Sequence, residues 1–95
     1  EEVEALASQI NKDLLKLYGS PVISGEQLQK ALAFRSIDSL RQAITRKTIP
    51  VPVFDLANRK GKYALVKDIA QYLAEQARKN VEEVNKDEND KINRA

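Results

Sequence analysis

The sequence predicts a small, mainly α-helical domain that carries one short β-hairpin. Three observations support this fold class. Apolar residues recur at intervals of three and four along most of the chain, serines stand where two helices would begin, and one segment containing Pro50 and Pro52 interrupts the helical pattern. Because 95 residues provide one domain at most, these elements have to share a single core.

The first predicted element is an amphipathic N-terminal helix over residues 1–18. Its apolar residues lie three, four, four and three positions apart, which aligns them as one stripe: Val3, Leu6, Ile10, Leu14 and Leu17. Residues 19–21, Gly-Ser-Pro, end the helix. A small domain is not expected to bury such a stripe fully, so we consider this helix a candidate dimerisation element.

Two short helices are predicted next, at the start of a central domain over residues 19–80. Ser24 can cap the first, with Gln27 returning the hydrogen bond as a capping box. Ser36 can cap the second, whose apolar face of Ile37, Leu40 and Ile44 extends to about Lys47. Two capped helices separated by a few residues predict a helix-turn-helix.

A β-hairpin is predicted after these helices. Pro50 and Pro52 disfavour helix and favour extended chain, so residues 51–56 are expected to form an edge strand. Residues 58–61 form the turn and residues 62–66 the return strand. The hairpin therefore has a cationic tip that contains Arg59, Lys60 and Lys62.

A fourth helix is predicted from Asp68, with apolar positions Ile69, Leu73, Ala77, Val81 and Val84. Residues 81–95 are rich in charged groups, and we expect the helix to end within this segment and the rest of the segment to be disordered. The first residue is Glu rather than Met, and whether residues precede it stays open.

Charge and composition narrow the class of function. Residues 21–80 carry eleven basic and five acidic side chains, whereas both flanking segments are acidic, as expected of a centre that meets a polyanion. The chain contains no Cys or His, and its three glycines are isolated, so it has no thiolate nucleophile, no histidine base and no Gly-rich phosphate loop. We expect no enzymatic activity, no cofactor and no bound metal. No apolar run approaches the length of a membrane span, so we expect a cytoplasmic, nucleoid-associated protein with no membrane partner.

The order helix, turn, helix, hairpin, helix is that of winged helix-turn-helix proteins, which place the second helix of the pair in the major groove of double-stranded DNA. We therefore predict that polar and basic residues of the third helix and of the hairpin contact DNA. The predicted DNA-binding residues are Arg35, Ser36, Asp38, Ser39, Arg41, Gln42, Thr45, Arg46, Lys47, Asn58, Arg59, Lys60 and Lys62. On the third helix, Arg41 and Thr45 are expected at the flanks of the outward face.

The stretch from Tyr18 to Ala74 also resembles a known group of proteins. The likeness lies in residues 18–23, 49–54 and 65–73. These segments resemble the excisionase and AlpA-like group of winged helix-turn-helix regulators, related in layout to MerR-type DNA-binding domains, and are most similar to the pyocin-activator (PrtN-like) family. The resemblance implies a transcription regulator or an excision accessory factor of a mobile element or prophage. Such regulators usually have Gly in the helix-helix turn and at the exit of the third helix, where this chain has Phe34 and Lys47, so a different turn geometry is expected.

An alternative function is a protein-interaction or assembly module, such as an adaptor or polymerase-docking factor, without its own DNA specificity. The apolar stripes of the two terminal helices favour this alternative. Both hypotheses are compatible with a homodimer, because a DNA-binding dimer needs an assembly surface. Whether the chain also binds a second protein stays open.

Overall fold

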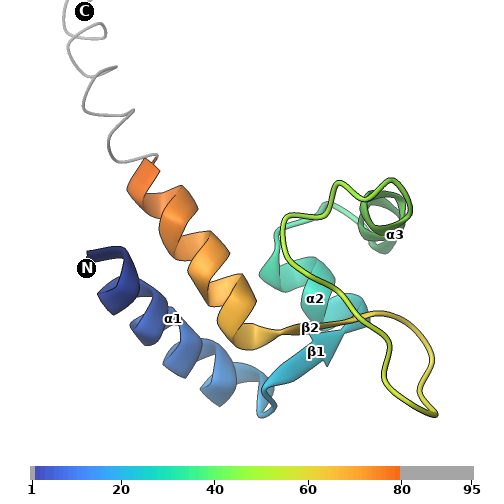
Figure 1. Ribbon diagram of the computed structural model, residues 1–95, viewed down its shortest axis with the longest axis horizontal. Coiled ribbons are helices and arrows are strands. Elements are labelled where there is room, and N and C mark those ends of the chain that lie inside the picture. Colours follow the sequence, from blue (N-terminus) through green and yellow to red (C-terminus); the bar gives the residue numbers. More distant parts are fainter. Residues whose placement is uncertain (1, 80–95) are drawn as a thin grey trace, which may run out of the picture.

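The computed structural model of the chain describes residues 2–79. Its elements are α1 (Glu2–Tyr18), β1 (Val22–Ser24), α2 (Gly25–Ala31), α3 (Ile37–Thr45), β2 (Tyr63–Leu65) and a C-terminal helix that covers residues 66–79 (Figure 1). The predicted mainly helical fold class is confirmed, since the described part of the chain contains four helices and a two-stranded antiparallel sheet. The tail predicted over residues 81–95 lies outside the described residues.

The sheet differs from the predicted hairpin. β1 pairs with β2, with Ile23 opposite Ala64, whereas the predicted strand over residues 51–56 makes a single bridge between Phe54 and Tyr63. The backbone N–H groups of Phe54 and Tyr63 each donate to the other residue's carbonyl, at 2.9 and 2.8 Å. Prolines before Phe54 lack the donors of a longer ladder, while both Ile23 and Ala64 are buried. The prediction of a regular hairpin was therefore wrong.

α1 and the C-terminal helix lie side by side and run antiparallel (Figure 1). Glu2, at the start of α1, forms an ion pair with Arg78, near the end of the described part of the C-terminal helix. Towards the other end of the pair, Asn11 and Lys67 line the same surface groove. Part of each predicted apolar stripe is therefore covered within one chain.

The core joins the sheet to the helices on either side of it. Its buried residues are Ile23, Leu28, Leu32, Leu40, Val51, Ala64, Val66 and Ile69. From α1, Leu14, Leu15 and Tyr18 pack against this cluster. From α3, Leu40 is buried in this cluster, and Ile37 and Ile44 pack against it.

Two predicted helix starts differ in detail. Ser24 occupies the N-cap position of α2, but its side chain makes no capping hydrogen bond, so the predicted capping box with Gln27 was wrong. The C-terminal helix begins at residue 66 rather than at Asp68. Val66 is fully buried and its N–H donates to the carbonyl of Pro21 at 2.8 Å, so core packing rather than a capping side chain sets this start.

Candidate functional site

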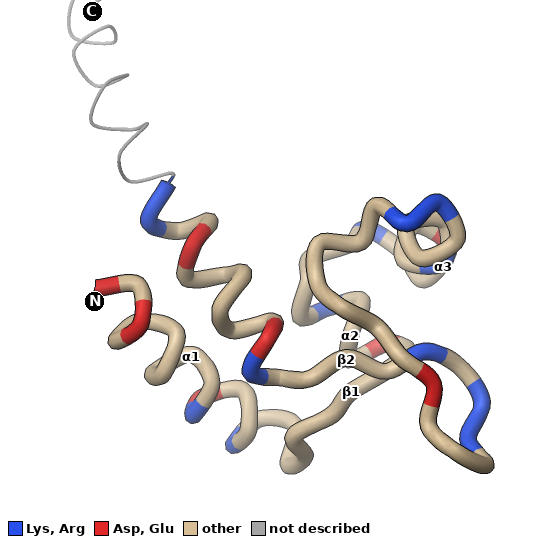
Figure 2. The backbone as a smooth tube through the Cα atoms, viewed as in Figure 1, with Lys and Arg blue, Asp and Glu red and all other residues tan. Residues whose placement is uncertain are grey.

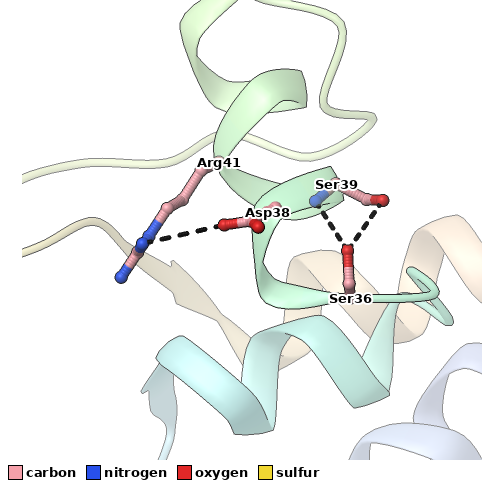
Figure 3. A network of polar contacts seen from close by, with 4 residues as sticks. All are labelled: Ser36, Asp38, Ser39 and Arg41. Atoms are coloured by element: carbon pink, nitrogen blue, oxygen red, sulfur yellow. Dashed lines mark hydrogen bonds and ion pairs between the residues drawn. The ribbon is translucent and has the colours of Figure 1, made fainter.

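The N-terminus of α3 is held by the serine that the sequence predicts as its cap. The Ser36 hydroxyl accepts a hydrogen bond from the backbone N–H of Ser39 at 3.1 Å (Figure 3). The hydroxyls of Ser36 and Ser39 also lie 3.1 Å apart and share a hydrogen bond. Both side chains, predicted to contact DNA, are thus already hydrogen-bonded to each other at the helix start, and the cap prediction is confirmed.

The C-terminus of α3 closes in a Schellman motif. Thr48 N–H donates to the carbonyl of Ala43 at 2.8 Å and Lys47 N–H to that of Ile44 at 3.2 Å. Lys47 has a φ of +59°, the left-handed conformation that usually selects glycine at this position. The helix was predicted to reach about Lys47 and instead ends at Thr45, because Lys47 turns the chain away.

α2 ends in the same way, which sets the turn that precedes α3. Phe34 N–H donates to the carbonyl of Gln29 at 3.0 Å and Ala33 N–H to that of Lys30 at 3.1 Å, with Ala33 at a φ of +62°. The Gln29 side-chain amide donates back to the Phe34 carbonyl at 2.8 Å. The left-handed residue is therefore Ala33, one position before the Phe34 at which the family resemblance places a glycine.

Packing sets which face of α3 points outward. Leu40 and Ala43 are its buried residues, at 2% and 7% exposure. At about 100° per residue, Asp38 and Thr45 lie opposite these two residues, Arg41 and Gln42 lie about 50° to either side, and Arg46 lies at the edge of this face. The five side chains line one surface depression of about 400 Å³. Arg41 and Thr45, predicted at the flanks, lie within the outward face, while Ser39 is half-buried at its edge.

The outward face of α3 combines cations with uncharged hydrogen-bonding groups. Arg41 Nη1 lies 3.9 Å from Asp38 Oδ1, and both side chains are largely exposed, at 74% and 80% (Figure 3). Such an exposed pair is weak, so each partner can exchange it for a ligand. Arg35, Arg46 and Lys47 add exposed positive charge around the same helix (Figure 2).

Residues 55–62 form an exposed loop, which we call the cationic loop. Asn58 and Gly61 take left-handed conformations, with φ of +63° and +90°, and Arg59 N–H donates to the Leu56 carbonyl at 3.1 Å. At the base of the loop, Lys62 Nζ lies 3.0 Å from Asp55 Oδ1. The loop extends beyond the end of the sheet, away from α1 and the C-terminal helix (Figure 1), and its last residues, Gly61 and Lys62, lie near α3.

The predicted DNA-binding residues thus divide into two groups. Arg35 to Lys47 lie on or beside α3, and Asn58 to Lys62 lie on the cationic loop. All except Ser39 are exposed. Because Lys62 is paired with Asp55, the positive charge of the loop tip rests on Arg59 and Lys60.

Sequence reasoning missed three residues that position α3: Gln29, Ala43 and Thr48. Gln29 fixes the turn before the helix, Ala43 completes the buried face, and Thr48 closes the helix end, where its hydroxyl also lies 3.4 Å from the Ala43 carbonyl. Ala43 was detectable, since it lies three residues from Leu40 on the same helical face. Nothing in sequence spacing marks the other two.

Within residues 2–79, no group of His, Cys, Asp and Glu side chains could hold a metal ion. No helix in that range is long and apolar enough to cross a membrane. Comparisons of the chain with protein-family models, with curated proteins and with solved structures find no match.

Proposed function

We propose that this protein is a sequence-specific double-stranded DNA-binding regulator with a winged helix-turn-helix domain. In this proposal α2 and α3 form the helix-turn-helix, α3 enters the major groove, and the cationic loop acts as the wing on the phosphate backbone. By the resemblance described above, its role is that of a transcription regulator or an excision factor of a mobile element or prophage.

The outward face of α3 is the observation that carries this proposal. Gln42 can pair with adenine, Arg41 and Arg46 with guanine or phosphate, and Asp38 with cytosine. A nine-residue helix is about 13 Å long. With its side chains an α-helix is about 10–12 Å across, which fits a major groove about 12 Å wide. The rest of the described chain does not cover this face, since these side chains are exposed.

The fixed ends of α3 support a role for this helix in the recognition of DNA bases. Base readout requires side chains to be held on a rigid element, because a misplaced hydrogen-bonding group loses its partner. The Ser36 cap and the Schellman motif at Lys47 hold both ends of α3, and Leu40 anchors its middle. Beyond its base the cationic loop has a turn hydrogen bond from Arg59 N–H to the Leu56 carbonyl but no buried residue, which suits phosphate contacts that require charge more than geometry.

The test is selection of binding sites from a pool of random-sequence duplexes, followed by titration of the selected and a scrambled duplex at two salt concentrations. The proposal predicts preference for the selected duplex and an affinity that falls steeply with salt for both. Absence of binding at low salt would refute it.

An assembly function is the second candidate, and one observation favours it. Leu6 and Leu17 on α1 are 39% and 70% exposed even though α1 packs against the C-terminal helix. We propose that this strip holds a homodimer or a second protein. Sedimentation of the wild type and of Leu6→Ser with Leu17→Ser tests it, and a wild type that remains monomeric at high concentration contradicts the homodimer.

A further inference from the structure

A concave pocket of about 380 Å³ lies on the flank of α3, between this helix and the C-terminal end of the cationic loop. Its floor consists of the aliphatic side chains of Ile37, Leu40 and Ile44. Leu40 belongs to the buried core, but Ile37 and Ile44 are only half-buried, because nothing in the described chain covers their outer sides. Part of the apolar face of α3 is therefore open to solvent.

The rim of the pocket is polar and positively charged. Arg41 and Lys62 stand on it from opposite elements, α3 and the cationic loop, and Thr45 adds a hydroxyl. No acidic side chain lines the pocket, since Asp38 and Asp55, which pair with these two cations, lie outside the lining. A bound anion would therefore have to replace Asp38 and Asp55 as the partners of Arg41 and Lys62, and exposed ion pairs of this kind are weak enough to be exchanged.

Two of the residues that line the pocket are glycines, which have no side chain to fill it. Gly25, at the start of α2, and Gly61, in the loop, both line it. A Cβ atom built at either position would meet no other atom within 4 Å, which shows that open space adjoins both backbones.

From this arrangement we infer that the pocket binds a small organic anion with an apolar body, such as a medium-chain or aryl carboxylate. Its volume falls within the usual range of small-molecule sites, roughly 300–1,000 Å³, which are apolar with a few charged groups that orient the ligand. The apolar body would cover Ile37 and Ile44, and the carboxylate would accept charge-assisted hydrogen bonds from Arg41 and Lys62.

The site has a regulatory consequence, and this part rests on the proposed function. Arg41 and Thr45 line both this pocket and the outward face of α3. An anion bound in the pocket would occupy Arg41 and place negative charge beside the surface that meets DNA phosphates. Ligand and duplex would therefore compete, and the ligand would weaken DNA binding.

The direct test uses octanoate as the probe and nuclear magnetic resonance of the isotope-labelled full chain. Octanoate should cause saturable shifts that concentrate at the backbone amides of residues 25, 37, 41, 44–45 and 61–62. Acetate, with the charge but no apolar body, and octylammonium, with the same chain and the opposite charge, should not reproduce them. Shifts elsewhere, or equal shifts with all three compounds, would overturn the inference. Shifts in this pocket that appear on concentrating the protein alone would assign it to a second copy and would also overturn it.

Two pairs of variants distinguish octanoate binding in the pocket from a general attraction of octanoate to surface charge. Lys62→Gln and Arg41→Gln should each weaken octanoate binding by about five-fold, because each removes one charge-assisted hydrogen bond. Lys60→Gln, in the same loop, and Arg46→Gln, on the same helix, remove charges that do not line the pocket and should leave octanoate affinity unchanged. Equal losses in both members of a pair would overturn the inference. All four side chains are exposed, so the fold is expected to survive.

Titration of a selected duplex with and without octanoate distinguishes the inference from the proposed function. Octanoate binding without any DNA binding would support the pocket and refute the DNA-binding role. DNA binding with no octanoate shifts would refute the pocket and leave the DNA-binding role standing. Binding of both without competition would overturn the regulatory consequence alone.

Discussion

The two cationic regions of this molecule are built in opposite ways. α3 has a buried face, a serine cap at its start and a Schellman motif at its end. In the cationic loop every residue from 55 to 62 is exposed, and the loop is tied down at its base by the Phe54–Tyr63 bridge and the Asp55–Lys62 ion pair. Both regions carry similar side chains, so the difference lies in how firmly the backbone holds them.

This difference implies a division of labour. A hydrogen bond to a base edge depends on position within a few tenths of an ångström, whereas a cation near phosphates acts over several ångströms. We therefore expect α3 to determine sequence preference and the loop to add affinity without preference. The following predictions, from the largest expected effect to the smallest, test that comparison.

Removing the anchor of α3 should have the largest effect. Leu40→Ala leaves a cavity beneath the helix and is expected to lower the free energy of unfolding by about 2–5 kcal/mol. Urea unfolding measures this loss. Leu17→Ala is the matched control, because Leu17 is mostly exposed and its truncation should change stability by less than about 0.5 kcal/mol. Similar losses in the two variants would mean that α3 is not anchored as described.

Gln42→Ala tests readout by α3. Gln42 is exposed and lines the depression on the outward face, so its removal should cost about 1–3 kcal/mol on a selected duplex and little on a scrambled one. Fluorescence titration of both duplexes measures the difference. An equal loss on the two duplexes would place readout elsewhere.

The double variant Arg59→Ala with Lys60→Ala tests the loop. It should weaken both duplexes alike, by roughly ten-fold, and reduce the salt dependence by about one unit for each lost phosphate contact. Titrations over a series of salt concentrations give the slope. If only the sequences that flank the selected site change in affinity, the loop itself reads the minor groove and the comparison fails.

Ser36→Ala tests the cap of α3. Loss of the hydrogen bond from Ser39 N–H should lower stability by about 1 kcal/mol. Ser24→Ala is the control, since Ser24 is also an N-cap residue but makes no capping hydrogen bond and should cost clearly less. Thermal unfolding of both variants measures the two losses of stability, and equal losses would argue against the Ser36 cap.

Lys47→Gly should have the smallest effect and the opposite sign. A left-handed lysine is strained by about 1 kcal/mol, so glycine is expected to raise stability by up to that amount. The same variant removes a predicted DNA contact, and DNA affinity should fall slightly at the same time. A loss of stability would show that the C-terminal turn of α3 does not depend on the left-handed residue.

Several features were predictable because they depend on residues close in the sequence. The Ser36 cap and the core position of Leu40 follow from local hydrogen bonding and helical spacing, and both agree with the structure. The helix α1 was also predicted, but its packed face was not: Leu14, Leu15 and Tyr18 pack against the core, whereas Leu17 of the predicted stripe is 70% exposed. The candidate site residues of α3 were found in the same way. The face was rotated slightly in the prediction, because Ala43 was not counted among the buried residues.

Other features depend on contacts between distant residues. Sequence reasoning paired residues 62–66 with their neighbours at 51–56, whereas β2 pairs chiefly with β1, about forty positions earlier, because burial of Ile23 against Ala64 outweighs the short loop closure. The antiparallel contact of α1 with the C-terminal helix is equally remote in sequence. So is the pocket between α3 and Lys62.

By itself the sequence determined where the helices lie, to within a few residues, and where the positive charge is, since periodicity, capping and composition act over a few residues. The tertiary structure alone decided which strand completes the sheet, how much of each apolar stripe is covered, and which charges meet around one cavity. The physical reason is that burial depends on which surfaces meet in space, and spacing along the chain does not specify that.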